Sequence, residues 1–103
     1  MEPSISLETA NAIVADKPAP RVTEDSIRAK IDFVSYELLA VGNTMLTLCF
    51  IRMANGFVFI GRAAPAHSAN FDRQVGERYA YEDAFKQIWS HEGYLLREKL
   101  AGD

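Results

Sequence analysis

Few residues in this 103-residue chain could do chemistry. Cys49 is the single cysteine and lies inside the apolar run MLTLCFI. Apolar surroundings raise the pKa of a thiol and make it inert, so we interpret Cys49 as structural. His67, Ser68 and Asp72 are the residue types of a hydrolytic triad, but one short loop rarely supplies a triad's geometry. The sequence therefore predicts no catalytic residues and a protein that is not an enzyme.

Metal and phosphate sites are not predicted either. His67 and His91 have acidic neighbours, but no C-x-x-C, H-E-x-x-H or calcium-loop spacing accompanies them. The glycines form neither a G-x-G-x-x-G nor a G-x-x-x-x-G-K-[ST] motif. We therefore expect no metal and no cofactor.

Cationic and aromatic side chains gather where a loop leads into the last predicted helix. Three arginines here, together with Tyr79 and Tyr81, could form a patch that receives an anionic nucleotide or an acidic protein surface. The alternative is that the arginines are simply solvated on an acidic protein. The candidate binding residues are Arg62, His67, Asn70, Arg73 and Arg78.

Composition limits the partners. The net charge is -3 and the pI is about 5.3, which argues against a nucleic-acid binder with a basic stripe. A single cysteine cannot form an internal disulfide, which fits a reducing compartment. No signal peptide is visible, and MLTLCFI is too short to cross a bilayer. We expect a soluble, cytoplasmic protein without a membrane partner.

The chain divides into a tail and one domain. Residues 1–21 contain three of the four prolines and are predicted to be a mobile tail, with a short helix over LETANAIVA as the alternative. Residues 22–103 form a single domain. Its first element is a short helix capped by Thr23, with Val22 and Ile27 spaced as a hydrophobic staple, and it ends near Lys30 or Ile31.

Three β-rich segments follow: IDFVSYELLAV, TMLTLCFIRM and FVFIGRA. Gly42-Asn43 separates the first two, and Asn55-Gly56 predicts a type I′ hairpin turn between the last two. These segments predict a three-stranded antiparallel meander with the second segment in the middle. Both faces of that middle strand are apolar, so it is either covered twice or meets a partner. We therefore expect a homodimer or a higher homo-oligomer.

A C-terminal helix completes an α+β fold. Asn70 is its predicted N-cap, and Gly93 is predicted to break it. At about 3.6 residues per turn, one apolar face combines two adjacent lines of side chains. The first line consists of Ala80, Ala84 and Ile88, and the second consists of Tyr81, Phe85 and Trp89.

Several short stretches follow one another in a distinctive order: APRVT at 19–23, NGF at 55–57, Gly61, NFD at 70–72, Gly76 and IW….EGYLL at 88–96. Taken together, they resemble one family, that of small tailed-phage proteins typified by a gene-49 and a gene-66 product of two podoviruses. The resemblance covers roughly residues 19–100.

The sequence departs from that pattern in two places. Gly61-Arg62-Ala63-Ala64-Pro65 stands where G-E-S-A-C is expected, with Ser68 in place of a proline. Ser90 and His91 replace a proline and an apolar residue. These departures leave open whether the loop recognises the same target in this member. The resemblance implies a phage origin and a non-structural accessory role, and it carries no catalytic residue to this chain.

Two functions follow as hypotheses. The first is an accessory protein in the host cytoplasm that binds and inhibits a host protein by occupancy, in the manner of a counter-defence protein. The second is an oligomer that binds or sequesters a small anionic ligand such as a nucleotide signal. A nucleic-acid partner is not expected, because basic charge and helix-turn-helix spacing are both missing.

Overall fold

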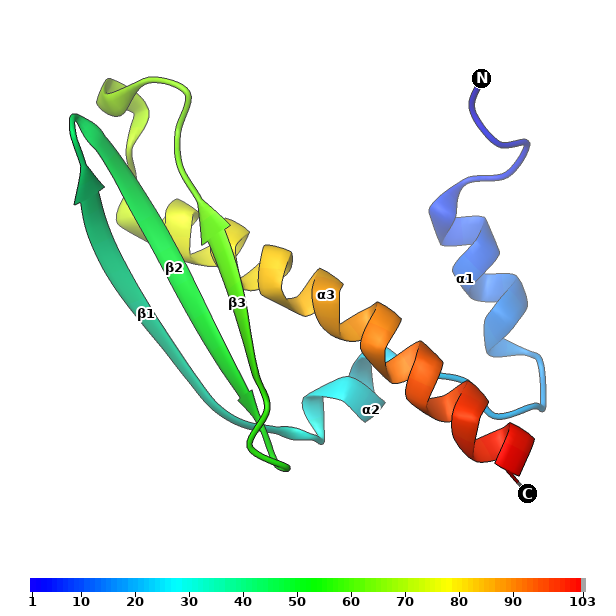
Figure 1. Ribbon diagram of the computed structural model, residues 1–103. Helices are drawn as coiled ribbons and strands as arrows, with labels where there is room; N and C mark the ends of the chain where they lie inside the picture. Colours follow the sequence, from blue (N-terminus) through cyan, green and yellow to red (C-terminus); the bar gives the residue numbers. More distant parts are fainter. Residues whose placement is uncertain (103) are drawn as a thin grey trace.

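A computed structural model describes residues 1–102 as a three-stranded sheet with a long helix across one face (Figure 1). The chain forms helices α1 (Leu7–Ala15) and α2 (Glu24–Arg28), strands β1 (Ile31–Val41), β2 (Thr44–Met53) and β3 (Val58–Ala63), the 3-10 helix η1 (Ser68–Asn70) and helix α3 (Arg73–Gly102). The α+β class predicted from the sequence is confirmed. Helix α3 begins behind the sheet and extends well beyond it (Figure 1).

The sheet is the predicted meander, with strand order β1-β2-β3 and both pairs antiparallel. The first two strands match the predicted segments at both ends. A register shift near Asp32 bulges the start of β1. At the β1-β2 turn Gly42 has φ 62° and Asn43 does not have a positive φ, which is the pattern of a type II′ turn.

The β2-β3 hairpin forms at Asn55-Gly56, but the predicted type I′ turn is wrong. Gly56 has φ 92°, whereas no residue other than glycine has a positive φ among residues 1–102. The Gly56 N–H donates to the Met53 carbonyl at 2.8 Å, so Ala54 and Asn55 are the central residues. Asn55 Oδ1 accepts from the Phe57 N–H at 2.9 Å. A three-residue loop with glycine in the left-handed region twists the strands correctly without a strained asparagine.

The two faces of β2 have different environments. Thr47, Cys49, Ile51 and Met53 are buried on the side of α3. The alternate side chains, such as Leu48, lie on the opposite face and are only half-buried. Burial therefore alternates along β2, which places the hydrophobic core in a single layer between the sheet and α3.

Helix α3 approaches the sheet through its smallest residues. Ala80 and Ala84 are fully buried, as is Ile88 one turn further on. A Cβ on Gly61 of β3 would clash with the Ala80 carbonyl oxygen and lie 2.5 Å from the Ala84 nitrogen. Gly76 is similar, because a Cβ there would lie 2.6 Å from Thr47 Oγ1. The backbone of α3 thus lies directly against the backbone of β3 at Gly61 and against the Thr47 side chain of β2 at Gly76.

Three predictions about α3 need correction. Asp72, not Asn70, caps the helix, because its Oδ1 accepts from the Val75 N–H at 3.0 Å. The helix also runs through Gly93 without a break, since a glycine only lowers helix propensity by about 1 kcal/mol and Gly93 has no positive φ. Trp89 is not a core residue, because it is 40% exposed while its neighbour Ile88 is fully buried.

The short helix α2 begins as predicted. Thr23 Oγ1 accepts from the Ser26 N–H and Ser26 Oγ accepts from the Thr23 N–H, both at 2.9 Å, which forms a reciprocal capping box. Ile27 is fully buried and Val22 packs against the core, in agreement with the hydrophobic staple. The helix ends at Arg28, slightly earlier than predicted.

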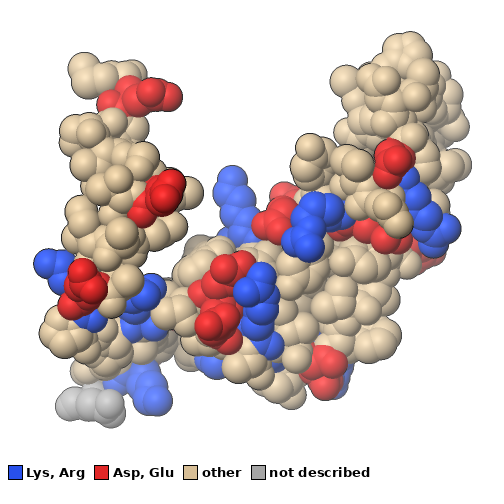
Figure 2. All heavy atoms as spheres, turned by 180° about the vertical axis from the view of Figure 1, so that it is seen from behind, with Lys and Arg blue, Asp and Glu red and all other residues tan. Residues whose placement is uncertain are grey.

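The N-terminal segment contains α1, which is the helical alternative considered for LETANAIVA. Ser6 caps it by accepting from the Thr9 N–H at 3.0 Å. None of residues 1–21 is buried, and this N-terminal arm stands apart from the body of the domain along most of its length (Figure 2). Among residues 1–102, no helix combines the length and apolar character needed to cross a bilayer.

Candidate functional site

The five residues predicted to bind do not converge on one site. Arg62 lies on β3 beside Leu48, so its side chain is on the face of the sheet that is turned away from α3. Its backbone N–H donates to Asp83 Oδ2 at 3.0 Å, which ties the end of β3 to the helix. Arg73 and Arg78 are on α3 itself, behind the sheet.

Arg73 and Arg78 already have anionic partners one helical turn further on. Arg73 Nε lies 3.4 Å from Glu77 Oε2, and Arg78 Nη1 lies 2.7 Å from Glu82 Oε1. The Arg78 guanidinium also sits over the Tyr81 ring, 5.4 Å from its centroid. The hydrogen bond to Glu82 raises the pKa of Arg78 above its usual value. Both arginines thus match the alternative of solvated cations on an acidic protein.

His67 and Asn70 shape the loop before α3. His67 Nδ1 accepts from the Ala69 N–H at 3.0 Å, and the Asn70 N–H donates to the His67 carbonyl at 2.9 Å. Asn70 lines a small hollow of about 140 Å³ together with Thr47, whose buried hydroxyl has no hydrogen-bond partner among the described residues.

Cys49 has the environment of a structural thiol. It is fully buried, and this burial raises its pKa to about 11 although a hydrogen bond to Tyr36 acts in the opposite direction. A thiol with that pKa is almost entirely protonated at neutral pH. No group of three potential metal ligands occurs within residues 1–102.

Some of the stretches that carry the family resemblance are explained by packing alone. Gly61 and Gly76 are required where β3 and β2 touch the backbone of α3. In NFD, Asp72 caps α3 and Phe71 lines the small hollow. These positions build the fold and do not by themselves indicate a function.

NGF and EGYLL are different, because the fold brings them together without burying them. NGF lies at the β2-β3 turn, and EGYLL lies on the part of α3 that extends past the sheet. Phe57 is 54% exposed, Tyr94 72% and Leu95 52%. All three line one hollow of about 470 Å³, which we call the aromatic groove. Large apolar groups that a fold leaves exposed around a concave surface indicate a binding site.

The wall of the aromatic groove is a cluster of three rings. Phe59 packs edge to face with Phe57 at 5.0 Å and with His91 at 4.9 Å between ring centroids. His91 Nδ1 lies 3.0 Å from the Gln87 carbonyl oxygen, which can only accept, so this nitrogen donates the hydrogen bond. Phe59 is buried and anchors the cluster to the core. The three rings are therefore held in place by their packing on one another and on the core.

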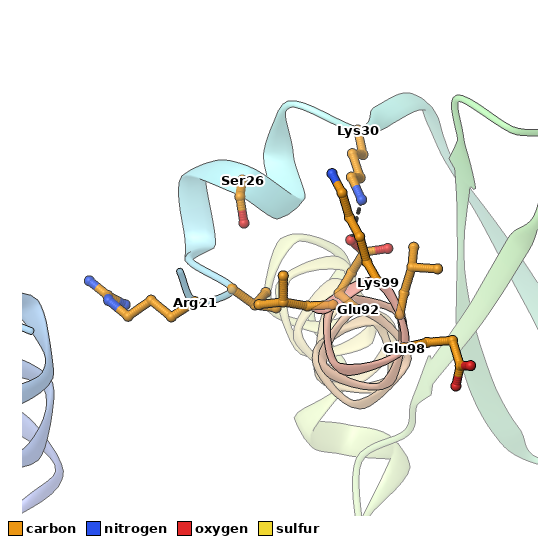
Figure 3. Close-up of a pocket in the computed structure, with 9 residues that line it drawn as sticks. Arg21, Ser26, Lys30, Glu92, Glu98 and Lys99 are labelled. Atoms are coloured by element: carbon orange, nitrogen blue, oxygen red, sulfur yellow. Dashed lines mark hydrogen bonds and ion pairs between the residues drawn. The ribbon is translucent and has the colours of Figure 1, made fainter. Parts of the chain in front are cut away.

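An ion pair separates this groove from a second hollow. Lys30 Nζ lies 2.6 Å from Glu92 Oε1, and the Glu92 side chain is only 16% exposed (Figure 3). Both residues line the aromatic groove and also the second hollow, which has a volume of about 550 Å³. The other polar residues that line the second hollow are Arg21, Ser26, Glu98 and Lys99 (Figure 3).

Sequence reasoning missed the aromatic groove because charge favoured the arginines as the binding residues. A signal was nevertheless in the sequence, because NGF and EGYLL each contain an aromatic residue and both belong to the stretches that carry the family resemblance. Charges on the face shown in Figure 2 are interspersed in sign, without a continuous basic stripe.

The fold defines a small α+β protein whose aromatic groove is an exposed, largely apolar hollow. The chain belongs to the Phage protein (N4 Gp49/phage Sf6 gene 66) family, whose model matches residues 22–100. The family predicted from the sequence is confirmed. No curated protein and no solved structure is significantly similar to the chain.

Proposed function

We propose that this phage protein is an accessory protein that binds a host protein in the aromatic groove and inhibits it by occupancy. One observation carries the proposal: NGF and EGYLL, which are far apart in the sequence, meet in a groove whose exposed rings the fold does not need. Membership of the family supports the identification of this chain as a phage protein. The groove is the surface through which it would act.

The chemistry of the groove fits a protein partner. Exposed aromatic residues such as Phe57 and Tyr94 are frequent energetic anchors of protein interfaces, because they bury a large area with few rotatable bonds. The Lys30-Glu92 pair at one side adds polar groups that can fix the orientation of a bound segment. An apolar side chain of the partner would pack on the Phe57-Phe59-His91 cluster.

Occupancy is favoured over catalysis by the state of the reactive groups. The thiol of Cys49 is buried and protonated, and His67 serves as a cap within its own loop. His91 is the one titratable ring in the cluster that walls the groove, and it is packed against the rings of Phe57 and Phe59. The proposal therefore assigns binding to the groove and gives no residue a catalytic role.

Affinity capture with matched variants tests the proposal. The full chain, immobilised through its exposed N-terminus, is incubated with host lysate, and bound proteins are identified by mass spectrometry. We expect Phe57→Ala and Tyr94→Ala to reduce capture of a specific host protein by about tenfold or more. Tyr79→Ala is the control, because Tyr79 is 64% exposed on the same helix but lies outside the groove.

The melting temperature of each variant separates loss of binding from loss of folding. If the groove variants capture the host protein as well as the wild type does, the aromatic groove is not the binding site. Loss of capture with Tyr79→Ala alone would move the site to the loop before α3. If the wild type captures nothing beyond an unrelated control protein, binding of a host protein is contradicted.

A small anionic ligand is the second candidate, and the second hollow favours it. Arg21 and Lys99 supply cationic groups to that hollow, whereas Lys30 is already paired with Glu92 (Figure 3). Glu98 also belongs to the lining. A sequestered nucleotide would be released on heating and detected by its ultraviolet absorbance. We expect Lys99→Glu to abolish the released absorbance, and absence of any such release from the wild type contradicts this candidate.

A further inference from the structure

The face of the sheet turned away from α3, which we call the open face, is apolar and uncovered. Its side chains follow from the strand register, since directly paired residues point to the same side. Phe33 is 59% exposed and Ile60 52%. Contiguous apolar patches of this kind are rare on monomeric proteins. The main apolar residues are Phe33, Leu39, Leu48, Phe50, Val58 and Ile60.

One row of the open face carries a distinctive pair of charges. Glu37 of β1, Leu48 of β2 and Arg62 of β3 are directly paired across the three strands. The anion is therefore on one edge of the face and the cation on the other, with an apolar residue between them. At a strand spacing of about 4.8 Å, the backbones at Glu37 and Arg62 are roughly 10 Å apart.

This arrangement of charges is complementary to itself. When two copies pack face to face about a two-fold axis parallel to β2, β1 of one copy lies over β3 of the other. Glu37 then faces the second copy's Arg62 on both sides, while Leu48 meets its own counterpart. An axis across the strands at the same row would instead oppose Glu37 to Glu37 and Arg62 to Arg62, which is unfavourable.

We propose that the open face binds a second copy of this chain, forming a two-fold sheet sandwich whose axis runs along β2. The neighbouring row, in which Phe50 lies between Ser35 and Ile60, supports the same direction of the axis. An axis along β2 would bring the two Phe50 rings together and bury them at the centre of the interface. At the next row, Arg52 would approach its counterpart, but each Arg52 is already neutralised by Asp32 of its own chain. Sandwiched sheets pack about 10 Å apart, a distance that side chains of this size fill.

This inference goes beyond the proposed function, and the two do not compete for surface. The aromatic groove involves α3 and the inward-facing Phe59, on the other side of the sheet from Ile60. The sandwich therefore leaves the aromatic groove of each copy accessible. A dimer with two grooves would gain avidity for a partner that is itself oligomeric.

Charge reversal with mixing tests the axis as well as the face. Glu37→Arg places two cations opposite each other at both edges of the sandwich, and Arg62→Glu places two anions there. Each variant alone is expected to weaken dimerisation by about tenfold or more, as measured by sedimentation velocity. An equimolar mixture restores the dimer. In the mixed dimer the two substituted side chains, which now have opposite charges, face each other at one edge, and an unchanged Arg62 faces an unchanged Glu37 at the other.

The mixture makes the result independent of folding defects, since two misfolded variants would not rescue each other. Lys86→Glu, an equal charge change on the exposed side of α3, is the control and leaves the dimer intact. A monomeric wild type at about 100 μM, where weak homodimers are populated, overturns the proposal. If neither Glu37→Arg nor Arg62→Glu weakens the dimer, the proposal is also wrong. That result would indicate that two copies pair through the free edge of β1. If each single variant dimerises weakly and the mixture does not restore the dimer, the proposed direction of the two-fold axis is wrong.

Discussion

The two halves of α3 have similar numbers of apolar residues but different roles. In the first half, Ala80, Ala84, Phe85 and Ile88 are buried against β2 and β3. In the second half, four large apolar residues are exposed: Trp89, Tyr94, Leu95 and Leu100. Two of them, Tyr94 and Leu95, line the aromatic groove. Small residues let a helix approach a sheet, whereas exposed large residues offer a surface to a partner. A continuous helix can thus combine a packing half and a binding half.

The largest expected effect separates neighbouring residues at the boundary between the halves. Ile88→Ala is expected to lower the free energy of unfolding by about 2–5 kcal/mol, because it leaves a cavity in the core. Trp89→Ala should cost only about 1–2 kcal/mol, because much of the indole is already in water. Urea denaturation of both variants measures the difference. Equal losses would place Trp89 in the packing half.

Adding a single methyl group tests the close approach of the first half. Gly61→Ala is expected to cost about 1–3 kcal/mol or more, because the new Cβ meets backbone atoms of Ala80 and Ala84 that cannot rotate away. Thermal unfolding followed by circular dichroism measures the loss. A variant as stable as the wild type would mean that α3 does not lie this close to β3.

The matching change in the second half has the opposite sign. A Cβ added at Gly93 would meet no atom within 4 Å, and this glycine lies well inside the helix. Gly93→Ala is therefore expected to raise stability by about 0.5–1 kcal/mol, through helix propensity and a less flexible unfolded chain. A lower melting temperature would show that the helix needs a break at this glycine.

The predictions made from the sequence succeeded where a local pattern is sufficient. The strand ends follow from β-rich runs that stop at Gly42 and near Gly56, and the capping box follows from Thr23 and its neighbours. The line of Ala80, Ala84 and Ile88 follows from the helical period. They failed where two distant segments decide the outcome. Whether Trp89 is buried depends on where the sheet ends beneath α3, which no helical period encodes.

The candidate site shows the same division. The arginines attracted attention as charges, but Glu77 and Glu82 neutralise two of them within the helix and the strand register sends Arg62 to the other face. The sequence by itself determined the three strands and their order, the start of α2 and the family, since these depend on residue types at short spacing. Only the tertiary structure brought Phe57 and Tyr94 to one groove and left one face of the sheet open. The reason is physical: burial depends on which surfaces meet, and a helix that extends past its sheet leaves side chains exposed that the sequence alone marks as apolar.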